Sequence, residues 1–324
     1  MKFIAIMAVI VGHYTHDWRS TFIYAWHMPL FFMVSGYLFS PSSFRENISR
    51  NAKRYLSPYA IVSIVIILIE IISTGNPPSL NTSIPLLTGG TAIWGYTGGA
   101  AIWFLMTLFL CSVGYNILYS STSIRQHITS IILALCCIGY ILNHYFKHTI
   151  PFTIPQTLIA ILFFHVGYCF KKYGSISPRS YSWLWWVLSI IFFTWSFRCG
   201  RLDMYFCIYP FLPINILGAI GGTFIILQIC HYFASYISAK ITRPIAWLGA
   251  ISILIFIAHT IEYSYDSSTK TGVIIGITDG TQQYLISKIL FALIVSLLLY
   301  QIPIVRKVFR LSKPQYIDLN TSNQ

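Results

Sequence analysis

Charged side chains are scarce in this sequence, and acidic ones are scarcer still. Only 9% of the 324 residues are charged, whereas a soluble domain has about 25%. Eight acidic residues are too few for a carboxylate metal cluster, so we expect no bound metal and no bound cofactor. The hydrophobic share of 56% and the aromatic share of 17% instead predict an all-α, polytopic membrane helical bundle.

The sequence also lacks the short motifs of several common chemistries. It has no Gly-rich phosphate loop, no HExxH zinc motif and no GxSxG nucleophile elbow. None of its seven cysteines forms a CxxC pair, which argues against a metal or redox site. Basic residues cluster only beside apolar runs, which argues against a nucleic-acid partner and favours contact with a lipid bilayer.

The apolar runs predict about ten transmembrane helices, since about 20 apolar residues cross a bilayer. The predicted spans are 3–18, 21–40, 55–73, 101–119, 127–145, 153–170, 183–197, 208–233, 244–263 and 284–305. We therefore expect one integral-membrane domain over 1–305, followed by a basic and polar cytoplasmic tail over 306–324.

Loop charge predicts the orientation of these spans. With the N-terminus inside, 15 of the 21 basic residues fall on the inner side and the remaining 6 on the outer side. Basic residues concentrate on the cytoplasmic side of membrane proteins. The count therefore favours both termini in the cytoplasm and an even number of spans.

Three histidines fall at comparable depth in the predicted bundle. His13 lies eleven residues, or about 16 Å, along a helix from Lys2. His27 follows a turn near the outer surface, and His259 occupies the outer half of the ninth span. Histidines inside membrane spans are costly and mark functional sites by default. The alternative for each is a hydrogen bond between helices and nothing more, which is how we interpret His165.

Charged candidates lie on both sides of this histidine layer. On the outer side, Arg201 and Asp203 either contribute to a site or form an ordinary surface ion pair. On the inner side, Arg54 stands at a helix entrance, where a guanidinium suits a phosphate group. Lys53 and the Lys171-Lys172 pair can add to such a site, or they are only the basic flank of membrane helices.

Several segments together resemble the acyltransferase 3 family of integral-membrane acyltransferases, most closely its fucose 4-O-acetylase-like branch. The matching features span nearly the whole chain, and their order and spacing make the set specific. In the first part of the chain they are the basic residue, ten-residue gap and histidine of 2–13, the HMPLFFMVSGYLF run of 27–39, and the pattern of Arg54 with Pro58-Tyr59. Further along they are the WFL segment of 103–105, the segments 163–173 and 217–227, and the late helix that carries His259. The pattern departs at its start, where Phe3 stands in place of the usual glycine.

The resemblance implies acyl transfer, usually of an acetyl group, from cytosolic acyl-CoA to a hydroxyl of a surface carbohydrate or its lipid-linked precursor. It implies a multi-pass protein of the cell (inner) membrane, with acyl-CoA as co-substrate and a carbohydrate as acceptor. We expect the catalytic residues to be His13, His27 and His259. We expect Arg54, Lys53, Lys171 and Lys172 to bind the donor, and Trp103, Arg201 and Asp203 to bind the acceptor. The alternative is a transporter or flippase of a glycolipid or polysaccharide precursor.

Overall fold

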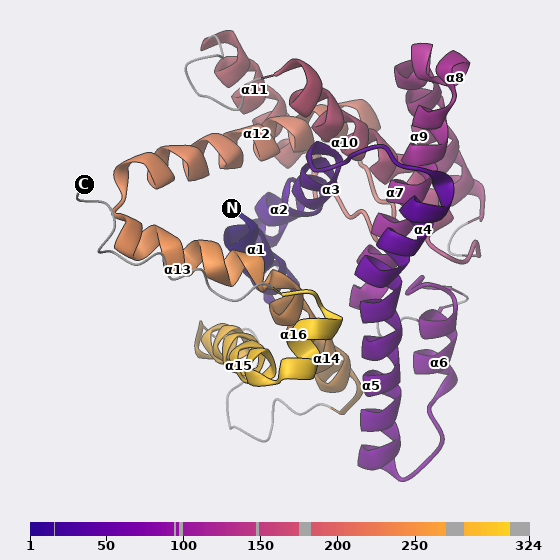
Figure 1. The fold of residues 1–324 in the computed structure, drawn as a ribbon, viewed down its shortest axis with the longest axis vertical. Coiled ribbons are helices and arrows are strands. Elements are labelled where there is room, and N and C mark those ends of the chain that lie inside the picture. Colours follow the sequence, from indigo (N-terminus) through magenta and orange to yellow (C-terminus); the bar gives the residue numbers. More distant parts are fainter. Residues whose placement is uncertain are drawn as a thin grey trace.

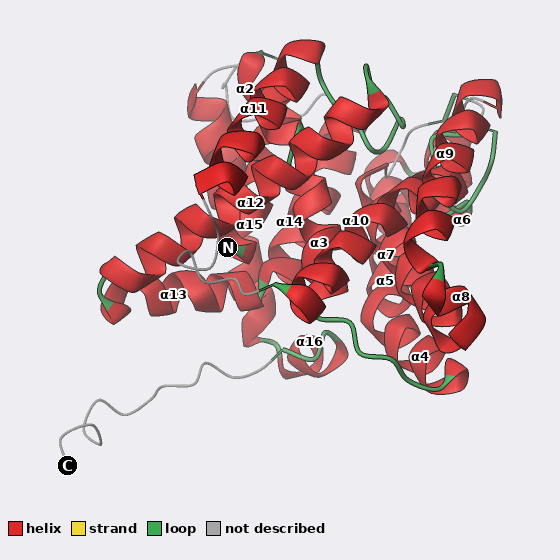
Figure 2. Cartoon of the chain, turned by 90° about the horizontal axis from the view of Figure 1, so that it is seen from above, coloured by secondary structure: helices red, strands yellow, loops and turns green. Residues whose placement is uncertain are grey.

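In a computed structural model the chain is an all-α membrane bundle, as the composition predicts (Figures 1 and 2). The structure describes residues 1–311 except 16, 94, 97–99, 147–148, 175–182 and 270–281. Of residues 265–269 and 282–283 it describes only the backbone. The α-helices are α1 (Lys2–Tyr14), α2 (Trp18–Tyr24), α3 (His27–Tyr37), α4 (Phe44–Asn51), α5 (Ser57–Thr74), α6 (Leu80–Leu87), α7 (Trp103–Ser120), α8 (Thr122–Gln126), α9 (Ile128–Phe146), α10 (Ile154–Tyr173), α11 (Trp183–Cys199), α12 (Leu212–Tyr236), α13 (Ala239–Ala250), α14 (Ser252–Thr269), α15 (Gln282–Gln301) and α16 (Pro303–Val308).

Each predicted span falls on helix. Six described helices are long and apolar enough to cross a membrane, or seven if α13 and α14, which meet at a 58° bend, form one broken span. The first two predicted spans are helical but short: α1 is one, and α2 and α3 form the other around a break at 25–26. The count of ten and the orientation of the termini stay predictions.

Helix α1 lies in the middle of the molecule (Figure 1). It contacts α2, α3, α13, α14 and α15, so residues from both ends of the chain surround it. Six of its residues besides Tyr14 are buried: Ala5, Ile6, Ala8, Val9, Ile10 and Gly12. A helix that is apolar on most of its surface suits this central position.

A π-helical turn, Ala52–Leu56, joins α4 to α5. Pro58 follows at the start of α5 and has no N–H group to donate to the carbonyl of Arg54. The wider turn accommodates that gap, and such turns often occur at functional sites. It carries Lys53 and Arg54, two of the predicted donor-binding residues.

Helices α3 and α10 touch backbone to backbone through two glycines. A Cβ atom added to Gly36 would lie 1.8 Å from the carbonyl oxygen of Phe164, and one added to Gly167 would lie 1.8 Å from that of Met33. Neither carbonyl can rotate away, because each belongs to a helix. The contact fixes α3, and with it His27, against α10.

We expect Gly36→Ala to destabilise the protein by more than about 3 kcal/mol, the upper end for an overpacked core, because a helix backbone must move. Thermal unfolding in detergent and the monodisperse fraction in gel filtration measure this loss. Gly114→Ala on α7 is the matched control, since its Cβ would meet only the Ile161 side chain at 3.8 Å. Equal stability of the two variants would contradict the close α3–α10 contact.

Candidate active site

Two of the three predicted histidines are in direct contact. His13 Nδ1 lies 2.8 Å from His259 Nε2, and the two rings are stacked with their centroids 5.1 Å apart. His13 stands at the end of α1 and His259 is fully buried in α14. The hydrogen bond joins residues 246 positions apart, so the fold builds it through the packing of α1 on α14.

A carboxylate lies behind this pair. Glu262 follows His259 by almost one turn of α14, and its Oε2 is 3.9 Å from His259 Nδ1. The hydroxyl of Tyr14 and the ammonium group of Lys288, from α15, both donate to Glu262. A separation of 3.9 Å is longer than a hydrogen bond, so Glu262 acts on His259 through its charge.

Tyr24 is a shared neighbour of His13 and His27. The Tyr24 ring centroid is 6.4 Å from that of His13 and 4.9 Å from that of His27. His27 donates from Nδ1 to the carbonyl of Ile23 at 2.8 Å, which leaves its Nε2 as the acceptor nitrogen of a neutral ring. The structure therefore brings Tyr24 into contact with His27 and with the His13–His259 pair.

Arg201 reaches this cluster from the loop that follows α11. Its guanidinium carbon lies 3.7 Å from the ring centroid of Tyr24, and its NH2 group lies 3.1 Å from Asp203 Oδ2. Its Nε is buried and, within the described chain, has no hydrogen-bond partner. Arg201 therefore lies at the histidine layer with one donor unused.

Asp203 holds a tight turn together. Its Oδ1 accepts from the backbone N–H groups of Tyr205 and Phe206, and its backbone pairs in both directions with Ile208. Burial raises the pKa of the Asp203 carboxyl, while Arg201 and the two N–H groups act in the opposite direction. Both carboxylate oxygens thus already have partners, so Asp203 positions Arg201 and the turn.

Trp103 supports that turn from α7. Its ring centroid is 5.9 Å from that of Tyr205, and Trp103 is buried. The Tyr205 hydroxyl is itself buried with no hydrogen-bond partner in the described residues. Trp103 therefore contacts the turn that carries Asp203 through the ring of Tyr205. Its role in binding the acceptor stays a prediction.

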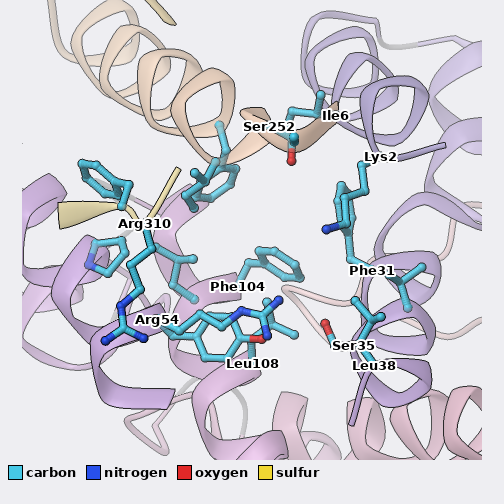
Figure 3. A pocket seen from close by; sticks show the side chains of 18 of the residues that line it. Lys2, Ile6, Phe31, Ser35, Leu38, Arg54, Phe104, Leu108, Ser252 and Arg310 are labelled. Atoms are coloured by element: carbon cyan, nitrogen blue, oxygen red, sulfur yellow. The ribbon is translucent and has the colours of Figure 1, made fainter. Parts of the chain in front are cut away.

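A cavity of about 490 Å³ lies between α1, α3, α7 and α14 (Figure 3). Five basic side chains line it and, among the described residues, no acidic one does. These basic residues are Lys2, Arg50, Lys53, Arg54 and Arg310. The rest of the lining is largely apolar, so the cavity suits a ligand with an anionic part and an apolar part.

The cavity and the histidines share one face of α1. Lys2, Ile6 and Val9 line the cavity, and His13 continues the same i, i+4, i+7, i+11 stripe. Eleven residues are about three helical turns, so Lys2 and His13 point the same way about 16 Å apart. This geometry explains why a ten-residue gap between a basic residue and a histidine suits such a site.

Helices α3 and α14 repeat this arrangement. Phe31 lines the cavity one turn after His27, and Phe256 lines it one turn before His259. One turn of helix is about 5 Å along its axis. The apolar end of the cavity therefore lies one helical turn from each of the three histidines.

The two lysines of α10 do not reach this cavity. Lys171 donates to the carbonyl of Phe39 at 2.7 Å, and Lys172 lies over the ring of Tyr173 at 4.8 Å from its centroid. Neither lines the cavity, whereas Lys53 and Arg54 both do. Their donor-binding role stays a prediction, with Lys171 placed as a cap for the chain leaving α3.

Sequence reasoning missed several residues of the site. Glu262 lies near the outer end of a predicted span, where a carboxylate can reach water, so the sequence alone does not favour it as a site residue. Tyr14, Tyr24 and Arg310 were not singled out, and only the stripe from Lys2 to His13 offered a signal for the wall of the cavity. Within the described chain, no group of three or more His, Cys, Asp and Glu side chains could hold a metal ion.

Comparison with known proteins identifies the family of the chain. A family model described as an acyltransferase domain matches residues 1–301. No curated protein and no solved structure matches the chain. The family match and the apolar helices make it a multi-pass membrane protein. The chain therefore belongs to the acyltransferase 3 family of integral-membrane acyltransferases.

Proposed function

We propose that this acyltransferase moves an acyl group, an acetyl group in particular, from cytosolic acyl-CoA to a hydroxyl of a surface carbohydrate or its lipid-linked precursor. The cell (inner) membrane is the proposed location. The observation that carries the proposal is the basic cavity whose apolar end stops one turn short of the histidine cluster. A transporter of a glycolipid would not require a basic cavity whose apolar end lies next to a pair of histidines.

The donor side rests on charge. Acyl-CoA combines anionic phosphates with an extended, less polar arm that ends in the thioester. Arg54 and Lys2 lie on facing walls of the cavity (Figure 3), where the phosphates would bind. The arm would then run past Phe104 toward the histidines and place the thioester near His13.

The hydrogen bonds at the histidines favour one set of neutral tautomers. His13 donates from Nδ1 to His259 Nε2, and His259 then carries its own proton on Nδ1, toward Glu262. This assignment leaves the lone pair of His13 Nε2 free to accept a proton. Glu262 stabilises the positive charge that this proton brings to the pair.

The proposed reaction uses His13 first as base and then as acid. His13 Nε2 takes the proton of the acceptor hydroxyl, and the hydroxyl oxygen attacks the thioester carbonyl carbon. The carbon–sulfur bond breaks, and the leaving thiolate takes the proton back from His13. The products are the O-acyl carbohydrate and free CoA, with no net change at the histidine.

The acceptor would approach from the side of Arg201. Arg201 Nε and the Tyr205 hydroxyl are buried polar groups whose hydrogen-bonding capacity is unused within the described residues. A buried polar group without a partner is costly, and a sugar hydroxyl would satisfy it. Trp103 supports Tyr205 from behind.

Arg54 tests the donor assignment. We expect Arg54→Ala to raise the KM for acetyl-CoA at least about 10-fold, because a charge-assisted hydrogen bond contributes about 1.5–3 kcal/mol. Arg54→Lys should restore part of the loss, since an ammonium group cannot form a two-pronged contact. The measurement is transfer of labelled acetyl groups to an acceptor glycan by purified protein, with acetyl-CoA as the only donor.

Arg125→Ala is the matched control, because Arg125 contacts the ring of Tyr119 and does not line the cavity. Its KM should match that of the wild type. Transfer that needs no acetyl-CoA would contradict the donor proposal. Arg201→Ala should instead impair use of the acceptor and leave acetyl-CoA binding unchanged.

A further inference from the structure

The last helix of the described chain, α16, is followed by a left-handed residue that is not glycine. The N–H of Leu311 donates to the carbonyl of Arg306 at 2.9 Å, and the N–H of Arg310 donates to that of Lys307 at 3.3 Å. This pattern is a Schellman cap, in which the residue after the helix adopts the left-handed conformation. Arg310 holds that position with φ of 53°.

An arginine is a poor choice for this position by backbone criteria. Glycine is the usual residue there, because it has no Cβ to clash with the neighbouring carbonyl. A strained residue of this kind points to a function of its side chain. The side chain of Arg310 must therefore contribute something that glycine cannot.

The position of the side chain indicates what it contributes. Arg310 lines the basic cavity on the wall opposite Lys2 (Figure 3), between Phe309 and Leu311, which also line it. The cavity already carries four other basic side chains, and among the described residues no carboxylate lines it. Arg50 pairs with Glu46 at 3.9 Å, whereas Lys2, Lys53, Arg54 and Arg310 have no carboxylate partner among the described residues. These four cations repel one another unless an anion binds among them.

We propose that Arg310 is a donor-binding residue that contacts a phosphate group of the acyl-CoA, with the Schellman cap of α16 holding this exposed arginine in the wall of the cavity. This inference rests on the proposed function of the cavity and extends it to the C-terminal segment. The residues just after the membrane domain then complete the donor site. The left-handed backbone of Arg310 and the four unpaired cations in the cavity lining are two independent observations, and both lead to this assignment.

Arg310→Gly separates the binding role from a structural one. Glycine removes the guanidinium and relieves the backbone strain, so thermal stability in detergent should stay equal or rise. Affinity for acetyl-CoA, measured by calorimetry on the purified full chain, should fall about 10-fold. Affinity for acetyl-pantetheine, which keeps the thioester arm and lacks the nucleotide phosphates, should not change. Lys307→Ala, which removes a neighbouring cation that does not line the cavity, should bind acetyl-CoA like the wild type.

Wild-type affinity of Arg310→Gly for acetyl-CoA would overturn the assignment. An equal loss for acetyl-CoA and acetyl-pantetheine would also overturn it, because that result indicates a change in cavity shape. If the wild-type protein itself does not bind acetyl-CoA, the proposed donor is wrong and the assignment of Arg310 falls with it. The wild-type measurement therefore tests the function, and the variant tests Arg310.

Discussion

Replacing His13 by alanine should lower the rate of acyl transfer by about 10²–10⁴-fold, the usual contribution of a general base. The imidazole is the only group at the end of α1 that both contacts His259 and continues the wall of the basic cavity, among the residues that the structure describes. Binding of acetyl-CoA should persist, because the cations that line the cavity remain in place. Single-turnover transfer and equilibrium binding on the same preparation measure the two effects.

His144→Ala is the control for this substitution. His144 lies near the end of α9, is exposed, and has only the neighbouring Tyr145 ring as a described aromatic contact. Its transfer rate should match the wild type. Transfer at the wild-type rate by a well-folded His13→Ala protein would refute the role of His13, whatever the donor.

Glu262→Gln should have the second largest effect, a fall in kcat of about 10²-fold with little change in KM. Glutamine keeps the shape of the side chain and can still accept from Tyr14, but it cannot offset positive charge on the histidine pair. In serine hydrolases the analogous change of a buried carboxylate behind a histidine lowers kcat by about 10⁴-fold, because the histidine then adopts the wrong tautomer. Steady-state kinetics with acetyl-CoA and a fixed glycan acceptor separate the two parameters.

Glu262→Asp should recover part of the activity, because the charge returns at a greater distance from His259. Glu70→Gln is the matched control, since Glu70 accepts from the backbone of Ser79 in the loop after α5 and contacts no histidine. If Glu262→Gln raises KM and leaves kcat unchanged, Glu262 serves binding and not the histidine pair.

The periodic features of the chain were predictable from the sequence. Apolar runs of the right length predicted helices, and each predicted span falls on helix. Depth along those helices correctly grouped His13 with His259. The charge rule placed Lys2, Arg50, Lys53, Arg54 and Arg310 on one side of the membrane, and these five residues line one cavity.

The sequence could not predict which side chains meet across the bundle. Tyr24, the last residue of α2, lies against both His13 and His27, and no periodicity predicts that only two residues separate α2 from α3. Lys171 was expected at the donor site, but a backbone carbonyl of Phe39 lies closer to it. The sequence also could not predict that Tyr14 and Lys288, from α1 and α15, both donate to Glu262 beside His259.

The stripe from Lys2 to His13 makes α1 sensitive to length. A substitution at a buried position between them changes volume but leaves the direction of both end residues intact. A single inserted residue would instead rotate His13 by about 100° relative to Lys2 and shift it by about 1.5 Å. The imidazole would then face a different neighbouring helix, away from His259 and from the apolar end of the cavity. The number of residues between Lys2 and His13 is therefore constrained more tightly than the identity of those intervening residues.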